Sequence, residues 1–91
     1  MPSYFELRAT GSTLSSIRAA DTLAGRLNES ATDLGVRIVA VRRSHPGAFV
    51  YAYSSRARQV PNAVVNRLRK DDRFADYGFS DESPTSDGPF S

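Results

Sequence analysis

Apolar and polar side chains alternate over residues 3–10 (SYFELRAT). One side of an extended chain would carry Phe5, Leu7 and Ala9, and the other side Tyr4, Glu6 and Arg8. Because side chains of a strand point alternately to its two faces, this period of two predicts a strand with one buried face. Gly11 ends the pattern.

A second pattern follows, in which apolar residues recur at three- and four-residue steps. Its members are Leu14, Ile17, Ala20, Ala24, Leu27, Ala31 and Leu34. This spacing predicts an amphipathic helix over residues 13–31. Ser12 or Thr13 is the expected N-cap, because a hydroxyl oxygen accepts the free amides of a first helical turn. Gly35 is the expected end of this segment.

Residues 36–44 (VRIVAVRRS) and 48–55 (AFVYAYSS) predict two further strands. The short SHPG turn between them makes the two strands antiparallel. Pro61 suits the first turn of a second helix, which we expect to end near Asp72. Residues 75–80 (ADYGFS) predict a short edge strand.

The resulting order is β-α-β-β-α with a short fourth strand. Since a crossover between parallel strands of one sheet is right-handed, both helices should cover the same side. The predicted fold class is therefore α+β, a ferredoxin-like two-layer sandwich. Residues 1–79 are expected to form a single domain, and residues 80–91, which lack any periodicity, a flexible acidic tail.

The strand over residues 48–55 is apolar on both faces. A one-residue change of hairpin register would turn the side chains of each face to the opposite side of the sheet. The strand over residues 36–44 should bury Val36, Ile38 and Ala40. An even loop, which we favour, places Phe49, Tyr51 and Tyr53 beside them in the core and leaves Val39, Val41, Val50 and Ala52 outside. An odd loop instead exposes Tyr4, Phe49, Tyr51 and Tyr53.

In either register the uncovered face of the sheet carries apolar side chains with an arginine border. Apolar patches of several hundred Å² usually mark contact sites on monomers. For the even loop, the candidate partner-binding residues are Arg8, Arg37, Val39, Val41, Arg43 and Val50. The expected partner is a protein or a second copy of the chain. Burial of apolar surface would supply the affinity, and bidentate contacts of arginine with carboxylates would set the orientation.

The odd-loop version resembles the RNA recognition motif family. Gly47-Ala48-Phe49-Val50 matches the centre of that family's third-strand pattern, although Pro46 replaces the basic residue and Ala52 an aromatic one. The resemblance implies that aromatic residues of the sheet stack on bases. The alternative function is thus single-stranded RNA or DNA binding by Tyr4, Phe49, Tyr51, Tyr53, Arg56 and Arg58.

Charge is unevenly distributed along the 91 residues, whose net charge is +2. Residues 1–75 hold all twelve basic residues against six acidic ones, whereas residues 76–91 hold four acidic residues. A basic body permits an anionic partner, and it equally permits contact with the acidic tail. A basic cluster around the second helix could track phosphates, but it is interpreted as an ordinary solvated helix face. Its members are Arg56, Arg58, Arg67, Arg69, Lys70 and Arg73.

No catalytic, cofactor-binding or metal-binding residue is assigned. The chain has no cysteine, and its single histidine, His45, precedes a proline in the turn. Asp71 and Asp72 are adjacent carboxylates, which diverge on a helix. With no membrane span and no signal peptide visible, we expect a cytoplasmic protein.

The predicted function is therefore that of a small non-enzymatic binding protein. Inhibitors of larger complexes, such as phage-borne anti-defence (anti-CRISPR-like) proteins, are one class of that kind.

Overall fold

The computed structural model describes residues 3–55 and 61–82. The elements follow in the order β1 (Ser3–Thr10), α1 (Ile17–Ala31), η1 (Thr32–Leu34), β2 (Val36–His45), β3 (Ala48–Ser55), α2 (Pro61–Lys70), η2 (Asp72–Phe74) and β4 (Gly78–Glu82). The four strands form one antiparallel sheet in the order β2-β3-β1-β4. The predicted α+β class is confirmed, and the arrangement is compatible with a two-layer sandwich.

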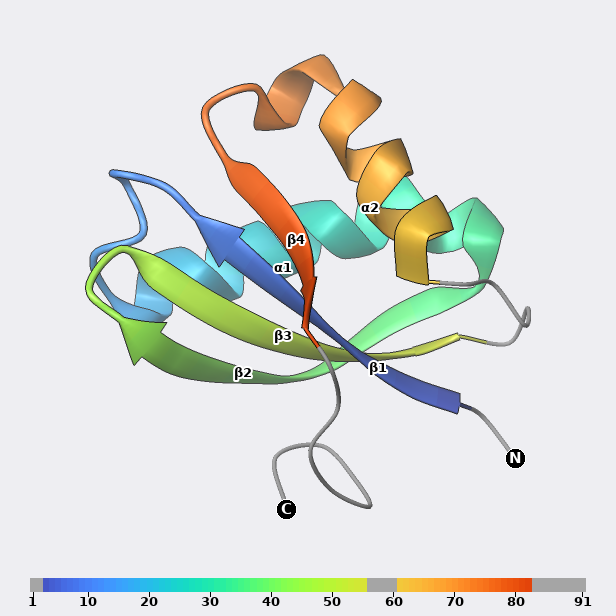
Figure 1. The fold of residues 1–91 in the computed structure, drawn as a ribbon, viewed down its shortest axis with the longest axis horizontal. Coiled ribbons are helices and arrows are strands. Elements are labelled where there is room, and N and C mark those ends of the chain that lie inside the picture. Colours follow the sequence, from blue (N-terminus) through green and yellow to red (C-terminus); the bar gives the residue numbers. More distant parts are fainter. Residues whose placement is uncertain (1–2, 56–60, 83–91) are drawn as a thin grey trace.

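Both helices lie on one side of the sheet, where the core forms (Figure 1). Leu23 and Leu27 of α1 and Val64 and Leu68 of α2 are each no more than 2% exposed. They pack against the sheet side that carries Leu7, Ala9, Phe49, Tyr51 and Tyr53. We call this side of the sheet the helix side and the opposite side the outer face.

The register of β3 is set by the hairpin turn. Pro46 and Gly47 separate β2 from β3, so the loop has an even number of residues. Gly47 has φ +80°, a conformation that glycine adopts without steric cost. Phe49 and Tyr51 are 0% exposed and Tyr53 is 1% exposed. The favoured even register, with the aromatic residues inside, is therefore confirmed.

The two buried phenols are not equivalent. The hydroxyl of Tyr51 donates a hydrogen bond of 2.9 Å to the carbonyl oxygen of Ala20 in α1. The hydroxyl of Tyr53 is buried and has no partner among the described residues. Burial raises the pKa of both groups, and Asp21 and Asp81 raise them further. Both phenols therefore remain neutral within the core.

The pairing of β2 with β3 contains a bulge at Val39. Ile38 lies opposite Tyr53 and Ala40 lies opposite Ala52, so Val39 is an extra residue without a partner in β3. From Ala40 to Arg43 the two faces of β2 are exchanged relative to a regular strand, and a second register shift between Arg43 and His45 restores them. Ala40 was predicted in the core, but it lies on the outer face, and Val41 packs against the core in its place.

Helix α1 begins later than the sequence pattern predicted. Its N-cap is Ser16, whose hydroxyl oxygen accepts a 3.2 Å hydrogen bond from the amide of Ala19. The expectation of Ser12 or Thr13 as the cap was wrong, because the chain uses these residues to connect β1 to the helix. Gly35, with φ 70°, ends the helical segment after η1, as predicted.

β4 forms one edge of the sheet, beside β1. It occupies Gly78–Glu82, so the strand begins three residues later than predicted and extends beyond the predicted domain end at residue 79. The guanidinium of Arg69 in α2 donates to the carbonyl oxygen of Phe79 at 2.7 and 3.2 Å, which ties the helix to this edge. Residues 83–91, most of the predicted tail, lie outside the described residues.

Candidate functional site

The outer face of the sheet carries a patterned set of polar side chains. Opposite residues of an antiparallel pair point to the same side, so the strand registers place the side chains in rows. One row is Arg42, Val50, Arg8 and Ser80, and the next is Ala40, Ala52, Glu6 and Glu82. Arg37, Ser54 and Tyr4 form a third row. Neither helix covers this side (Figure 1).

Arg8 reaches across a neighbouring strand. It stands on β1, and its guanidinium donates a 2.7 Å hydrogen bond to Nε2 of His45, the last residue of β2. Since β3 lies between β1 and β2, the Arg8 side chain passes over β3. Val50 lies between Arg8 and Arg42 in the row and is 1% exposed. The Nε atom of Arg8 is buried and has no acceptor among the described residues.

Glu6 is an acid on a sheet face that no helix covers, yet it is only 7% exposed. Its direct neighbour across β1 and β4 is Glu82. Two carboxylates opposite each other on adjacent strands repel, and a buried carboxylate without a partner is costly. Neither residue has a hydrogen bond or ion pair with the described part of the chain. This carboxylate pair is the feature of the outer face that most needs a cation.

The predicted partner-binding residues are divided between the two sides of the sheet. Arg8, Arg37 and Val50 lie on the outer face as expected, although Val50 offers almost no surface. Val39 is 43% exposed, at the bulge.

The bulge turns the two other predicted residues to the helix side, and their assignment to the outer face was wrong. Val41 lies opposite Tyr51, and Arg43 lies opposite Phe49 with its guanidinium carbon 5.4 Å from the ring centroid. Arg43 also donates to the carbonyl oxygen of Ser15. The expected aliphatic patch is therefore replaced by a charged face.

The candidate nucleic-acid residues are also separated. Phe49, Tyr51 and Tyr53 are buried on the helix side and present no ring face to a base. Tyr4 lies on the outer face and is 45% exposed. Arg56 and Arg58 lie outside the described residues. The aromatic surface of the odd register does not form.

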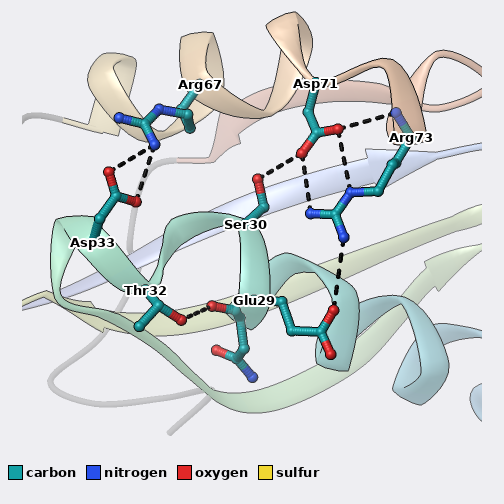
Figure 2. A network of polar contacts seen from close by, with 8 residues as sticks. Glu29, Ser30, Thr32, Asp33, Arg67, Asp71 and Arg73 are labelled. Atoms are coloured by element: carbon teal, nitrogen blue, oxygen red, sulfur yellow. Dashed lines mark hydrogen bonds and ion pairs between the residues drawn. The ribbon is translucent and has the colours of Figure 1, made fainter.

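Arg67 of α2 and Arg73 of η2 are paired with acids of this chain (Figure 2). Arg67 donates to both carboxylate oxygens of Asp33, at 3.0 and 2.8 Å. Arg73 is bonded to Asp71, which also accepts a 2.9 Å hydrogen bond from Ser30 of α1. Two charges of the basic cluster, those of Arg67 and Arg73, therefore pair with acids of this chain and do not stand alone on a solvated helix face.

A shallow depression of about 360 Å³ lies over this network. It is lined by Glu29, Ser30, Arg67, Lys70, Asp71 and Arg73. Its lining carries three basic and two acidic side chains, and two of the three cations, Arg67 and Arg73, are paired with carboxylates of the chain. Within the described ranges, no group of three or more histidine, aspartate or glutamate residues could hold a metal ion.

Asp71 should make the stability of the fold depend on pH. Hydrogen bonds from the Arg73 side chain, then from its backbone amide and from Ser30, lower the pKa of Asp71 from 3.8 to about 2. A group with a lowered folded pKa stabilises the fold above its unfolded pKa, and this contribution is lost as the pH falls through the folded value. We therefore expect Asp71→Asn to lower Tm near pH 6, with the difference from wild type disappearing between about pH 4 and pH 2.

Thermal unfolding at several pH values would measure this difference. Glu29→Gln is a suitable control, because the Glu29 side chain is 73% exposed and lies 3.7 Å from Arg73. Such exposed pairs contribute little. A Tm difference for Asp71→Asn that stays constant down to pH 2 would contradict the assignment.

Sequence reasoning missed the pairing of Glu6 with Glu82 and the contact of Arg8 with His45. The residues of each pair are far apart in the chain, and only the strand registers bring them together. The signal that was present is the alternation in β1, which put Glu6 and Arg8 on the same side of the strand.

Comparison with protein-family models, curated proteins and solved structures finds no significant match to this chain. Of the helices in the described ranges, none has both the length and the apolar character needed to cross a membrane.

Proposed function

We propose that the chain is a ferredoxin-like sandwich that acts as a non-enzymatic binding protein through its outer face. The fold assignment is supported by two β-α-β crossovers, one through α1 and one through α2, with β1 and β3 as the central strands. In this architecture the helices occupy one side of the sheet, and the outer face offers contacts through its exposed side chains, Tyr4, Arg37 and Arg42.

The observation that carries the function is the charge pattern of the outer face. Arg8 and Arg42 lie in the row on one side of the Glu6–Glu82 row and Arg37 lies in the row on its other side, all on the side away from both helices. The guanidinium group of arginine binds carboxylates with defined geometry, and the adjacent glutamates would be stabilised by a cation. The partner is therefore a protein surface with charges of both signs, and the near balance of signs disfavours nucleic acid.

Binding of this kind works by occlusion or bridging, since the face has no reactive group. An inhibitor that covers a site on a larger complex, as anti-CRISPR-like proteins do, is one role for such a chain. Electrostatic complementarity of the two surfaces would set the association rate and the orientation of the complex.

Affinity capture with matched variants tests this function. The wild-type chain and Arg37→Glu/Arg42→Glu are immobilised and exposed to an extract of the cells that produce the protein. Arg18→Glu/Arg26→Glu is the control, because it reverses two exposed arginines of α1 on the opposite side of the molecule. We expect a protein, or a second copy of the chain, to be retained by the wild type and the control.

The same protein should be lost from the outer-face variant by roughly tenfold or more, since like charges across an interface are costly. Equal capture by all three proteins, or equal loss from both variants, would contradict the proposal. Circular dichroism of each variant shows whether its fold is intact.

A further inference from the structure

We propose that residues 40–43, the part of β2 next to the hairpin, bind an extended acidic segment of a protein partner by strand addition. The segment would pair with the backbone at the edge of the sheet, so this contact goes beyond the outer-face function and does not depend on it. β2 is the edge strand opposite β4 (Figure 1). An edge strand presents backbone groups that can pair with another extended chain.

The strand registers show which backbone groups face this edge. The amide of Ile38 donates a 2.7 Å hydrogen bond to Oδ1 of Asn28 in α1, so it points away from β3. Successive residues of an antiparallel strand point their amide and carbonyl groups alternately to the two sides. Ile38, Val41 and Arg43 all lie opposite odd-numbered residues of β3. The amide and carbonyl groups of Val41 and Arg43 therefore also point away from β3.

The edge groups of Val41 and Arg43 are open, whereas the preceding part of the edge is closed. Neither residue has a backbone hydrogen bond at this edge to the described part of the chain. Asn28 occupies the amide of Ile38, and the bulge at Val39 interrupts the strand, which protects an edge from pairing. Residues 40–43 remain as a regular run between the bulge and the second register shift.

The charge of this run decides the chemistry of the added segment. β2 (Val36–His45) contains three arginines and no acidic residue. Arg42 and Arg43 lie in the open run, on opposite faces of the sheet, and both are exposed. None of the ion pairs among the described residues involves Arg43. Since opposite charges on neighbouring strands attract, the fitting segment carries carboxylates that face these two arginines.

The same charges disfavour two other occupants of the edge. Pairing of β2 with β2 of a second copy would bring the arginines of the two chains together, and like charges on neighbouring strands are destabilising. A nucleic acid would meet the same arginines with its phosphates, but it has no peptide groups to pair with the backbone of Val41 and Arg43.

Fluorescence anisotropy with a synthetic peptide tests the inference on the full chain. The probe is a short fluorescein-labelled peptide of alternating glutamate and threonine, because threonine favours an extended chain. We expect saturable binding to the wild type. Arg43→Glu should weaken it by roughly tenfold or more, since it places like charges on neighbouring strands. Arg26→Glu makes the same change of net charge at an exposed residue of α1 and should leave the binding unchanged.

Two measurements separate backbone pairing from the attraction of charges. Val41→Pro removes the outward amide and keeps both arginines, and proline is tolerated where the amide of an edge strand faces away from the sheet. We expect it to weaken binding by roughly fivefold, the effect of one lost hydrogen bond, while the melting curve remains cooperative. The same peptide with every amide N-methylated keeps its carboxylates but cannot donate to the edge. It should bind the wild-type chain by roughly tenfold or more less tightly.

A chain that does not bind the peptide would overturn the inference. Equal binding of the N-methylated peptide would also overturn it, because charge alone would then hold the peptide. Sedimentation velocity tests the second copy as an occupant, and a dimer that Val41→Pro dissociates would show that the edge pairs with its own chain instead. A chain that captures a protein through its outer face but does not bind the peptide would overturn this inference and leave the proposed function standing.

Discussion

Replacing Tyr51 with alanine is expected to lower the free energy of unfolding by about 3–5 kcal/mol, as for other buried aromatic residues. The ring is 0% exposed and lies at the centre of the helix side. The substitution removes its packing and leaves a cavity. It also removes the 2.9 Å hydrogen bond to the Ala20 carbonyl oxygen, which ties β3 to α1. A chain of this length has a total stability of about 5–14 kcal/mol, so the loss is a large fraction of it.

Urea unfolding followed by circular dichroism would measure the change. Tyr4→Ala is the matched control, because it makes the same substitution on the outer face at a residue that is 45% exposed. We expect it to change stability by less than about 1 kcal/mol. Equal effects of the two substitutions would mean that the aromatic residues of β3 do not face the helices.

The position of the aromatic residues could be predicted, but only through the turn. The alternation of Phe49, Tyr51 and Tyr53 with smaller apolar residues fits either face of the sheet. Pro46 and Gly47 decided between the registers, because this pair favours a two-residue loop in which glycine takes the positive φ. The residues of the turn thus determined which face of the whole strand is buried.

The face assignment of β2 could not be predicted in the same way. Residues 38–41 are all apolar, so the sequence does not fix which of them face the core, and nothing local marks Val39 as an extra residue. The bulge is a consequence of packing, since it puts Val41, in place of the smaller Ala40, beside Tyr51. It also brings Arg43 over the ring of Phe49. A bulge depends on how the strand pairs with its neighbour, so the residue pattern of one strand alone does not predict it.

The composition of the outer face was mispredicted for the same reason. A regular β2 would have put Val39 and Val41 there, and the expected surface was apolar. The observed face instead presents the arginines with the Glu6–Glu82 pair, and Glu82 had been assigned to the tail. Edge-strand boundaries are weakly marked in sequence, so the acid that completes the pair was visible only once β4 was placed beside β1.

Deleting Val39 is expected to preserve the fold, whereas deleting Ala52 is expected to abolish it. Val39 has no partner in β3, and β2 is an edge strand, so its removal leaves the pairs Ile38–Tyr53 and Ala40–Ala52 in register. The deletion should therefore cost no more than about 1–2 kcal/mol, the usual range for a change away from the core.

Ala52 is in the opposite situation. It is paired with Ala40 on one side and with Glu6 on the other, so its removal shifts two ladders at once. The shift would turn either Tyr51 or Tyr53 from the core to the outer face. Exposing one of these rings costs several kcal/mol, which approaches the whole stability of the domain.

Thermal melts and amide NMR spectra of the two deletion variants would measure the contrast. A cooperative melt and dispersed amide signals are expected after deletion of Val39, and neither after deletion of Ala52. Comparable loss of structure in both variants would show that Val39 is part of a regular ladder. In that case Val41 and Arg43 would belong to the outer face, and the charged rows that support the proposed function would have to be redrawn.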